Sequence, residues 1–419
     1  MGEKKTVFSK IIKLFLMLVA SIGIGYTLLV MAYLIPLNNI KENLGNSYQL
    51  LETEGAWRKL IGEHEDTLLD NWTDSTILIE TGYKYLQPAY QAALLVPECS
   101  VIDNNPTDSF IKLYRQDADV QVTEWNYVNY WHGYLIFMKP LMTFMTYGQI
   151  RYLNQFLQTA LIGVILALLG MRRKVWYAIP VVLSYIFLNP AVVSMSIQYN
   201  TMFLITFIQV LVILIFNDSY KKKDIWVYHF FIVGCATSYF DFLTYPIIGY
   251  GVPMILLISF YPSDIKKEFL NLIKTGLAWC FGYIGMWAGK WVLGTVLTDE
   301  NILQQAIERI WYRSRGDASE YTYMDILKRN LELRKDVIVI SIIFMLGCLV
   351  YLIVRKTVID WRKLVAYLLL SAIPFAWFFV AANHSYIHYF FTYRNLTIVV
   401  MGITCMGIKM IEETGGGYH

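Results

Sequence analysis

Two carboxylates, Asp70 and Asp74, lie four residues apart in the heptapeptide LLDNWTD at positions 68–74. They belong to residues 37–131, the only large hydrophilic block of a very apolar chain. A carboxylate in such a block can act as a general base or hold a divalent cation. We therefore treat Asp70 and Asp74 as candidate catalytic residues.

The local structure decides where these carboxylates point. If the segment is helical throughout, Asp66, Asp70 and Asp74 lie along one face and repel one another by roughly 0.2–0.5 kcal/mol per pair. Alternatively, Asn71 caps a helix that begins at Trp72, and Asp74 is then favoured by the helix dipole. The capped arrangement leaves Asp70 without a structural role.

A third carboxylate, Asp241, interrupts the apolar run 225–261. This run is barely long enough for two membrane spans of about 20 residues each, so Asp241 is expected in a short hairpin at or below the outer headgroups. An ionised group there is costly unless it is paired or faces water. A catalytic role is the default interpretation, and an ion pair with a neighbouring helix is the alternative.

Lys290 is a single cation in the outer half of the apolar segment 274–297. It can snorkel to the interface, pair with Asp241, or hold a lipid phosphate as a compact point charge.

Histidines and a further arginine are predicted on the same membrane face, in residues 383–395. His384 and His388 are four residues apart and share a face if this segment is helical. Their spacing also suits a divalent metal, but the sequence lacks the glutamate of an HExxH zinc site. We expect phosphate or sugar recognition instead, with Arg394 as a planar donor for phosphate oxygens.

Three arginines with aromatic residues between them occupy positions 309–317. Arg313 and Arg315 are candidates for binding an anionic group at the membrane surface. The alternative is that this segment neutralises lipid headgroups or pairs with nearby acidic residues.

The composition is that of a polytopic membrane protein. The 419 residues are 56% hydrophobic and 16% charged, against about 25% charged in a soluble domain. A net charge of +3 gives no argument for binding nucleic acid. The five cysteines form no CxxC motif, and there is no P-loop or dinucleotide-binding GxGxxG.

Ten segments approach the roughly 20 apolar residues that a spanning helix needs: 11–36, 150–171, 175–195, 197–217, 225–241, 243–261, 274–297, 337–354, 364–382 and 396–411. Lys and Arg clusters fall in alternate linkers, which are therefore cytoplasmic, as are both termini.

This pattern predicts an all-α membrane protein with a mostly helical extracytoplasmic loop domain. The predicted parts are a cytoplasmic N-terminus and first helix (1–36), the loop domain (37–149), a multi-span domain (150–411) with an outer loop (298–336), and a cytoplasmic tail (412–419). Within the loop domain, residues 133–147 are expected to form a partial span or an interfacial helix. The preceding aromatic sequence YWHGY at 130–134 anchors it at the headgroups or contacts substrate.

An acidic extracytoplasmic loop after the first helix, a multi-span core and basic groups near the outer face together resemble the GT-C superfamily of membrane glycosyltransferases. The segment 70–74 matches the acidic first loop of that superfamily in kind, although the family's carboxylate usually follows the first helix more closely. The blocks YWHG at 130–133 and FTYRN at 391–395 also resemble those of Gram-positive membrane proteins of surface-polysaccharide loci. The resemblance implies a bacterial plasma-membrane enzyme.

The resemblance further implies a sugar donor linked to polyprenyl phosphate and a glycan or lipid-linked acceptor. A carboxylate would deprotonate the acceptor hydroxyl, and Lys or Arg would stabilise the departing phosphate. Phosphate is already a good leaving group, so no nucleotide is needed, and a pyrophosphate carrier would favour a divalent cation such as Mg²⁺ or Mn²⁺. The alternatives are a polymerase of lipid-linked repeat units and a flippase of a lipid-linked saccharide.

Overall fold

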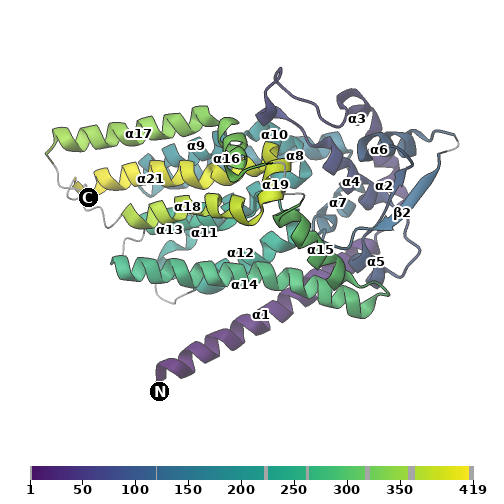
Figure 1. Ribbon diagram of the computed structural model, residues 1–419, viewed down its shortest axis with the longest axis horizontal. Helices are drawn as coiled ribbons and strands as arrows, with labels where there is room; N and C mark the ends of the chain where they lie inside the picture. The colour runs from purple at the N-terminus through teal and green to yellow at the C-terminus, as the bar shows by residue number, and fades with distance from the viewer. Residues whose placement is uncertain are drawn as a thin grey trace.

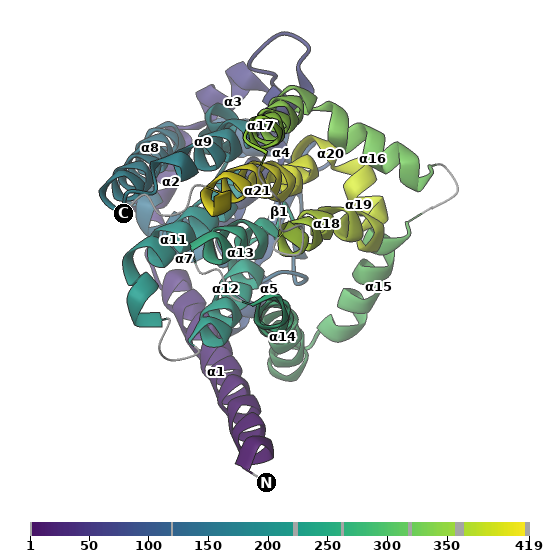
Figure 2. The same cartoon turned by 90° about the vertical axis from the view of Figure 1, so that its left-hand side faces the viewer.

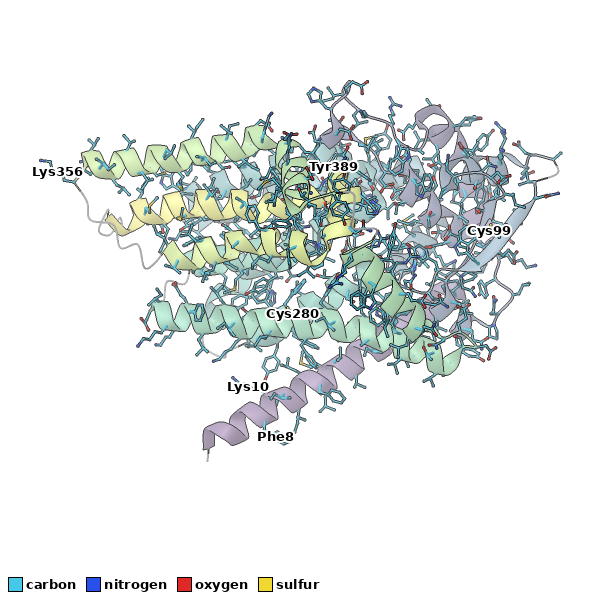
Figure 3. The ribbon with its side chains drawn as sticks, viewed as in Figure 1. Phe8, Lys10, Cys99, Cys280, Lys356 and Tyr389 are labelled. Atoms are coloured by element: carbon cyan, nitrogen blue, oxygen red, sulfur yellow. The ribbon has the colours of Figure 1, made fainter. Side chains whose placement is uncertain are left out.

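The computed structural model describes residues 2–118, 120–220, 225–260, 264–316, 321–356 and 364–414. It is mostly helical, with long helices side by side at one end and a loop domain of short elements at the other (Figure 1). Viewed along the bundle, the N-terminal helix α1 leaves the other helices and extends away from them (Figure 2). Figure 3 shows Cys99 in the loop domain and Cys280 on α14, and all five cysteines are free thiols.

The membrane domain contains the long apolar helices and the short turns between them. Its elements are α1 (Gly2–Tyr33), α8 (Tyr147–Met171), η2 (Val175–Tyr177), α9 (Ala178–Phe187), α10 (Pro190–Met195), α11 (Ile197–Tyr220), α12 (Trp226–Phe240), α13 (Ile248–Phe260), α14 (Ile265–Leu297), α17 (Lys335–Val354), α18 (Val365–Val380), η4 (Tyr393–Leu396) and α21 (Thr397–Thr414).

Five segments of the described chain are long and apolar enough to cross a membrane: Phe8–Tyr33, Tyr147–Met171, Ile197–Phe216, Lys335–Val354 and Tyr389–Glu412. Three shorter apolar helices, Val175–Phe187, Ile248–Phe260 and Val365–Val380, coincide with further predicted spans. The two remaining predicted spans correspond to α12 and α14. The membrane class is thus supported, and the number of ten spans stays a prediction.

Close contact between α12 and α14 fixes one side of the bundle. A Cβ atom on Gly234 would lie 2.1 Å from the carbonyl oxygen of Trp279, and one on Gly282 would lie 2.3 Å from that of Phe231. Small residues at such positions let two apolar helices pack backbone to backbone.

The loop domain contains several short helices and one pair of short strands. It contains α2 (Asn38–Gly45), α3 (Tyr48–Glu54), η1 (Glu65–Thr67), α4 (Asn71–Gly82), α5 (Ala89–Leu95), β1 (Pro97–Val101), α6 (Pro106–Arg115), β2 (Val122–Asn126) and α7 (Leu135–Met142). The strands β1 and β2 pair antiparallel, with Pro97 opposite Asn126 and Val101 opposite Val122. The outer-loop helices are α15 (Ile302–Ser314), α16 (Tyr323–Glu332), α19 (Ala382–Ile387) and α20 (Tyr389–Thr392).

Helix α4 begins one residue earlier than the capped prediction placed it. Asp70, not Asn71, is the N-cap residue, and its carboxylate accepts a hydrogen bond from the Thr73 amide at 3.0 Å. A single helix from Asp66 to Asp74 is also wrong, because α4 starts at Asn71. The mixed periodicity of α4 follows from its burial on nearly all sides, which leaves no polar face.

The position of residues 133–147 relative to the membrane stays a prediction, but two side chains expected at the headgroups are buried inside the protein. Trp131 is fully buried and its indole donates a hydrogen bond to the Met286 carbonyl at 2.7 Å. Lys139 is also buried and donates to the Thr81 carbonyl at 2.9 Å. These side chains join α7 to α4 and α14 inside the protein, so they cannot lie among lipid headgroups.

Candidate functional site

A cavity of about 500 Å³ lies where the loop domain meets the helix ends that the sequence predicts to face the outside. We call it the outer cavity. Its walls combine charged, amide and aromatic side chains from elements far apart in the sequence, including Trp72, Thr73, Glu98, Trp125, Tyr127, Tyr130, Gln198, Phe242, Arg309, Arg313, His384, His388 and Phe391.

Arg313, on α15, lies between the two histidines of the α19 segment. Its Nη1 is 2.9 Å from His384 Nδ1 and 2.9 Å from His388 Nε2. Because a guanidinium can only donate, both ring nitrogens act as acceptors. The other nitrogen of His384, Nε2, donates to the Leu243 carbonyl at 2.7 Å. The structure therefore brings together three residues that the sequence placed in separate outer loops.

Both histidines are neutral near pH 7. Burial, together with the charge of Arg313, lowers the pKa of His388 to about 3. Burial also holds the pKa of His384 well below 6.5, with His388 and Arg313 acting in the same direction. Arg313 Nε is buried and has no hydrogen-bond partner among the described residues. A guanidinium held in place at the wall of a cavity is suited to an anionic oxygen.

Asp70 lies behind the cavity wall. Its carboxylate accepts hydrogen bonds from the Thr73 hydroxyl at 2.9 Å and from Gln198 Nε2 at 2.5 Å, and both partners line the cavity. Burial raises the pKa of Asp70, while these bonds and the charge of Arg394 oppose the rise. Asp70 thus orients two cavity residues and is itself 2% exposed.

Asp74 holds the start of α11. Its carboxylate accepts from the Ile197 amide at 3.0 Å, from Tyr147 Oη at 2.5 Å and from Ser196 Oγ at 3.2 Å. Burial raises the pKa of Asp74 to about 7 despite these donors. Asp74 does not line the outer cavity, so its position is that of a cap between the loop domain and α11.

Asp241 stabilises the turn that follows α12. Its carboxylate accepts from the Thr244 amide at 3.1 Å and from the Thr244 hydroxyl. Leu243 in this turn has φ of +66°, a conformation that costs energy for a residue with a side chain. The carbonyl of Leu243 is the one that binds His384. Asp241 therefore positions a cavity histidine through the turn, and within the described part of the chain it forms no hydrogen bond or ion pair with Lys290.

Lys290 and Arg394 are both buried outside the cavity lining. Lys290 Nζ donates to the Leu94 carbonyl at 2.5 Å, at the C-terminal end of α5, where a cation is favoured. Arg394 Nε donates to the Leu188 carbonyl at 3.0 Å, and its guanidinium lies 4.4 Å from the centre of the Tyr199 ring. These contacts give each cation a structural partner.

Arg315 is exposed and stands over the ring of Trp311 at 5.2 Å, outside the cavity. The neighbouring arginine that does line the cavity with Arg313 is Arg309, one helical turn earlier.

Glu98 is the carboxylate that sequence reasoning missed. It lies on β1, it is the only carboxylate among the residues that line the outer cavity, and it is 2% exposed. Burial, together with the neighbouring carboxyl group of Glu80, raises the pKa of Glu98 to about 9. The sequence signals neither the short strand nor its partner β2, so nothing marked this glutamate as different from other loop residues.

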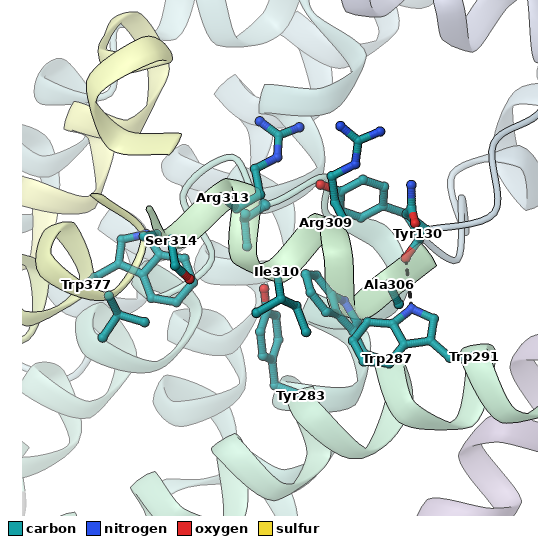
Figure 4. Close-up of a pocket in the computed structure, with 14 residues that line it drawn as sticks. Tyr130, Tyr283, Trp287, Trp291, Ala306, Arg309, Ile310, Arg313, Ser314 and Trp377 are labelled. Carbon is teal, nitrogen blue, oxygen red and sulfur yellow. Dashed lines mark hydrogen bonds between the residues drawn. The ribbon is translucent and has the colours of Figure 1, made fainter. Parts of the chain in front are cut away.

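A second, smaller pocket of about 140 Å³ adjoins the outer cavity on the side of α14 and α18. We call it the tryptophan pocket, because Trp287, Trp291 and Trp377 line it. Arg309 and Arg313 belong to the walls of both spaces. Figure 4 shows these two arginines extending from α15 on the same side, away from Tyr283 and Ile310. The apolar tryptophan pocket and the polar outer cavity thus share two positively charged side chains, Arg309 and Arg313.

Within the described ranges, no group of three or more His, Cys, Asp or Glu side chains could hold a metal ion. No protein-family model matches the chain, and neither a curated protein nor a solved structure is significantly similar to it.

Proposed function

We propose that this protein is a membrane glycosyltransferase that takes a sugar from a polyprenyl-phosphate carrier and transfers it to an extracytoplasmic acceptor. The observation that carries the proposal is the junction of the tryptophan pocket and the outer cavity at Arg309 and Arg313. A lipid-linked sugar has the same order of parts: an apolar chain, an anionic phosphate and a polar ring.

In this arrangement the first carbons of the prenyl chain occupy the tryptophan pocket, and the phosphate meets Arg313. The two neutral histidines fix the guanidinium before the substrate arrives, so little reorganisation is needed as charge develops on the leaving phosphate. Loss of one such donor typically costs roughly 10²–10³-fold in rate. The aromatic walls of the outer cavity provide flat surfaces for a sugar ring, which presents both apolar and polar groups.

The acceptor hydroxyl needs a base. Glu98 lines the outer cavity, whereas Asp70 lies behind Gln198 and Thr73, which would have to move aside before it could act. We therefore propose Glu98 as the carboxylate nearest the reacting groups. With a pKa of about 9, it is mainly protonated at pH 7 and becomes an effective base as the pH rises. Asp70, Asp74 and Asp241 stay predictions as catalytic residues, with capping roles as the alternative.

An assay with the protein reconstituted in liposomes distinguishes sugar transfer from translocation of the lipid-linked sugar between leaflets. Liposomes would contain the protein, a polyprenyl-phosphate sugar with a radiolabelled sugar, and an acceptor glycan. The proposal predicts a labelled glycan with a new glycosidic bond, and at least a tenfold lower rate for Arg313→Gln. Label that crosses between leaflets while still attached to its carrier would favour a flippase and contradict the proposal.

A further inference from the structure

Helix α15 presents three different faces around its axis. One face, with Ala306, Arg309 and Arg313, lines the outer cavity and the tryptophan pocket. A second carries polar residues such as Gln304 and Glu308, which are exposed. The third is apolar. A helix with separate apolar and polar faces at the edge of a membrane domain is typical of interfacial helices.

The third face is a stripe of large apolar side chains at i, i+4, i+7 and i+8 spacing. Leu303 is 42% exposed, Ile307 48%, Ile310 43% and Trp311 58%. At 100° per residue these positions fall within one arc of about 100°. These four side chains are thus 42–58% exposed, although Ile310 also lines the tryptophan pocket and the Arg315 guanidinium lies 5.2 Å from the centre of the Trp311 ring.

The surroundings of α15 indicate what covers the stripe. Its N-terminal end follows α14 after residues 298–301, and its C-terminal half packs beside α19 and the end of α18. The outer ends of both flanking helices also expose apolar side chains, Val296 on α14 and Phe379 on α18. Figure 2 shows α15 at the periphery of the bundle, beside α14 and α18. The stripe is thus continuous with the apolar flanks of the membrane domain, as a surface in contact with lipid would be.

We propose that α15 lies in the outer leaflet of the bilayer, with Leu303, Ile307, Ile310 and Trp311 among the acyl chains and Gln304 and Glu308 in water. The partner of this face is the lipid surface. In this position α15 forms the bilayer-side wall of the tryptophan pocket. This inference does not depend on the proposed chemistry, because it rests on the exposed stripe and its flanks alone.

Adjacent residues on α15 provide a matched test. Single cysteines would be introduced as Ile307→Cys and Glu308→Cys in the full chain carrying Cys280→Ser, which removes the one exposed native thiol. Each would be labelled with the fluorophore NBD and reconstituted in phosphatidylcholine–phosphatidylglycerol vesicles. A second pair, Leu303→Cys and Gln304→Cys, repeats the comparison one turn earlier. All four positions are exposed, so the substitutions leave the packing intact.

We expect lipids with a nitroxide near the headgroup to quench the label at 307 at least about twofold more than the label at 308, and aqueous iodide to show the opposite order. Equal quenching of both positions by iodide would place the stripe in water and overturn the proposal. Protection of position 307 from both quenchers would also overturn it, because a protein would then cover the stripe. Neither result depends on sugar transfer, so the proposed function is tested separately.

Discussion

Asp74→Asn tests whether the buried carboxylate at the start of α11 controls the pH dependence of folding. The carboxylate is fully buried, and its pKa rises from 3.8 to about 7 on folding. Because the folded state then binds a proton that the unfolded state releases, the free energy of unfolding falls as the pH rises between these values. At roughly 1.36 kcal/mol per pH unit, ionisation of Asp74 lowers the free energy of unfolding by about 4 kcal/mol between the two pKa values.

Asp74→Asn should lack this pH-dependent fall in the free energy of unfolding, because an asparagine cannot ionise. Its oxygen can still accept from the Ile197 amide, so the cap is retained. The measurement is the thermal unfolding midpoint of purified protein in detergent between pH 5 and pH 8. We expect the midpoint of the wild type to fall across this range by several degrees more than that of Asp74→Asn.

Subtracting the unfolding midpoint of Asp74→Asn from that of the wild type at each pH cancels the contribution of other groups that titrate in the same range. An exposed carboxylate on α15 provides the control: Glu308→Gln should follow the wild type at every pH. If Asp74→Asn and the wild type lose stability in parallel from pH 5 to pH 8, Asp74 ionises without cost and the burial argument is wrong. A variant that folds normally but transfers no sugar would instead revive a catalytic role for Asp74.

The remaining predictions concern the cavity and the buried cations. Arg313→Lys retains the charge but lacks the planar guanidinium, whose remaining donors can bind a phosphate oxygen while Nη1 binds both histidine rings. We therefore expect kcat/KM for the donor to fall roughly 10–100-fold, and an unchanged value would count against phosphate binding there. The transfer rate of the wild type should rise from pH 7 towards pH 9, and Glu98→Gln should be slow and lack that rise. Lys290→Met leaves the carbonyls at the end of α5 unpaired and should lower the unfolding midpoint with normal KM, whereas a raised KM would return Lys290 to the substrate site.

Patterns within single segments gave the predictions that agree with the structure. Long apolar runs identified the membrane class, because a spanning helix needs only its own residues to be apolar. The spacing of His384 and His388 placed both rings on one side of α19, and the arginine-rich segment contributed Arg313 to the same place.

Contacts between distant segments could not be predicted in this way. Asp70 and Asp74 were selected as an acidic pair, but their partners Gln198 and Ile197 lie more than a hundred residues away in the sequence. In the sequence Trp131 resembles an interfacial anchor, because nothing in its own segment shows that α14 packs against it. Glu98 becomes a cavity residue only through the pairing of β1 with β2, which places it beside the outer ends of the membrane helices.

The central claim is that a lipid-linked phosphate binds where the tryptophan pocket meets the outer cavity. The most direct measurement is a cryo-electron microscopy structure of the full chain in nanodiscs with polyprenyl phosphate. We predict the phosphate within hydrogen-bond distance of the Arg313 guanidinium and the first prenyl units beside Trp287 and Trp291. Density for the phosphate elsewhere, with Arg313 still bound only to His384 and His388, would contradict the account.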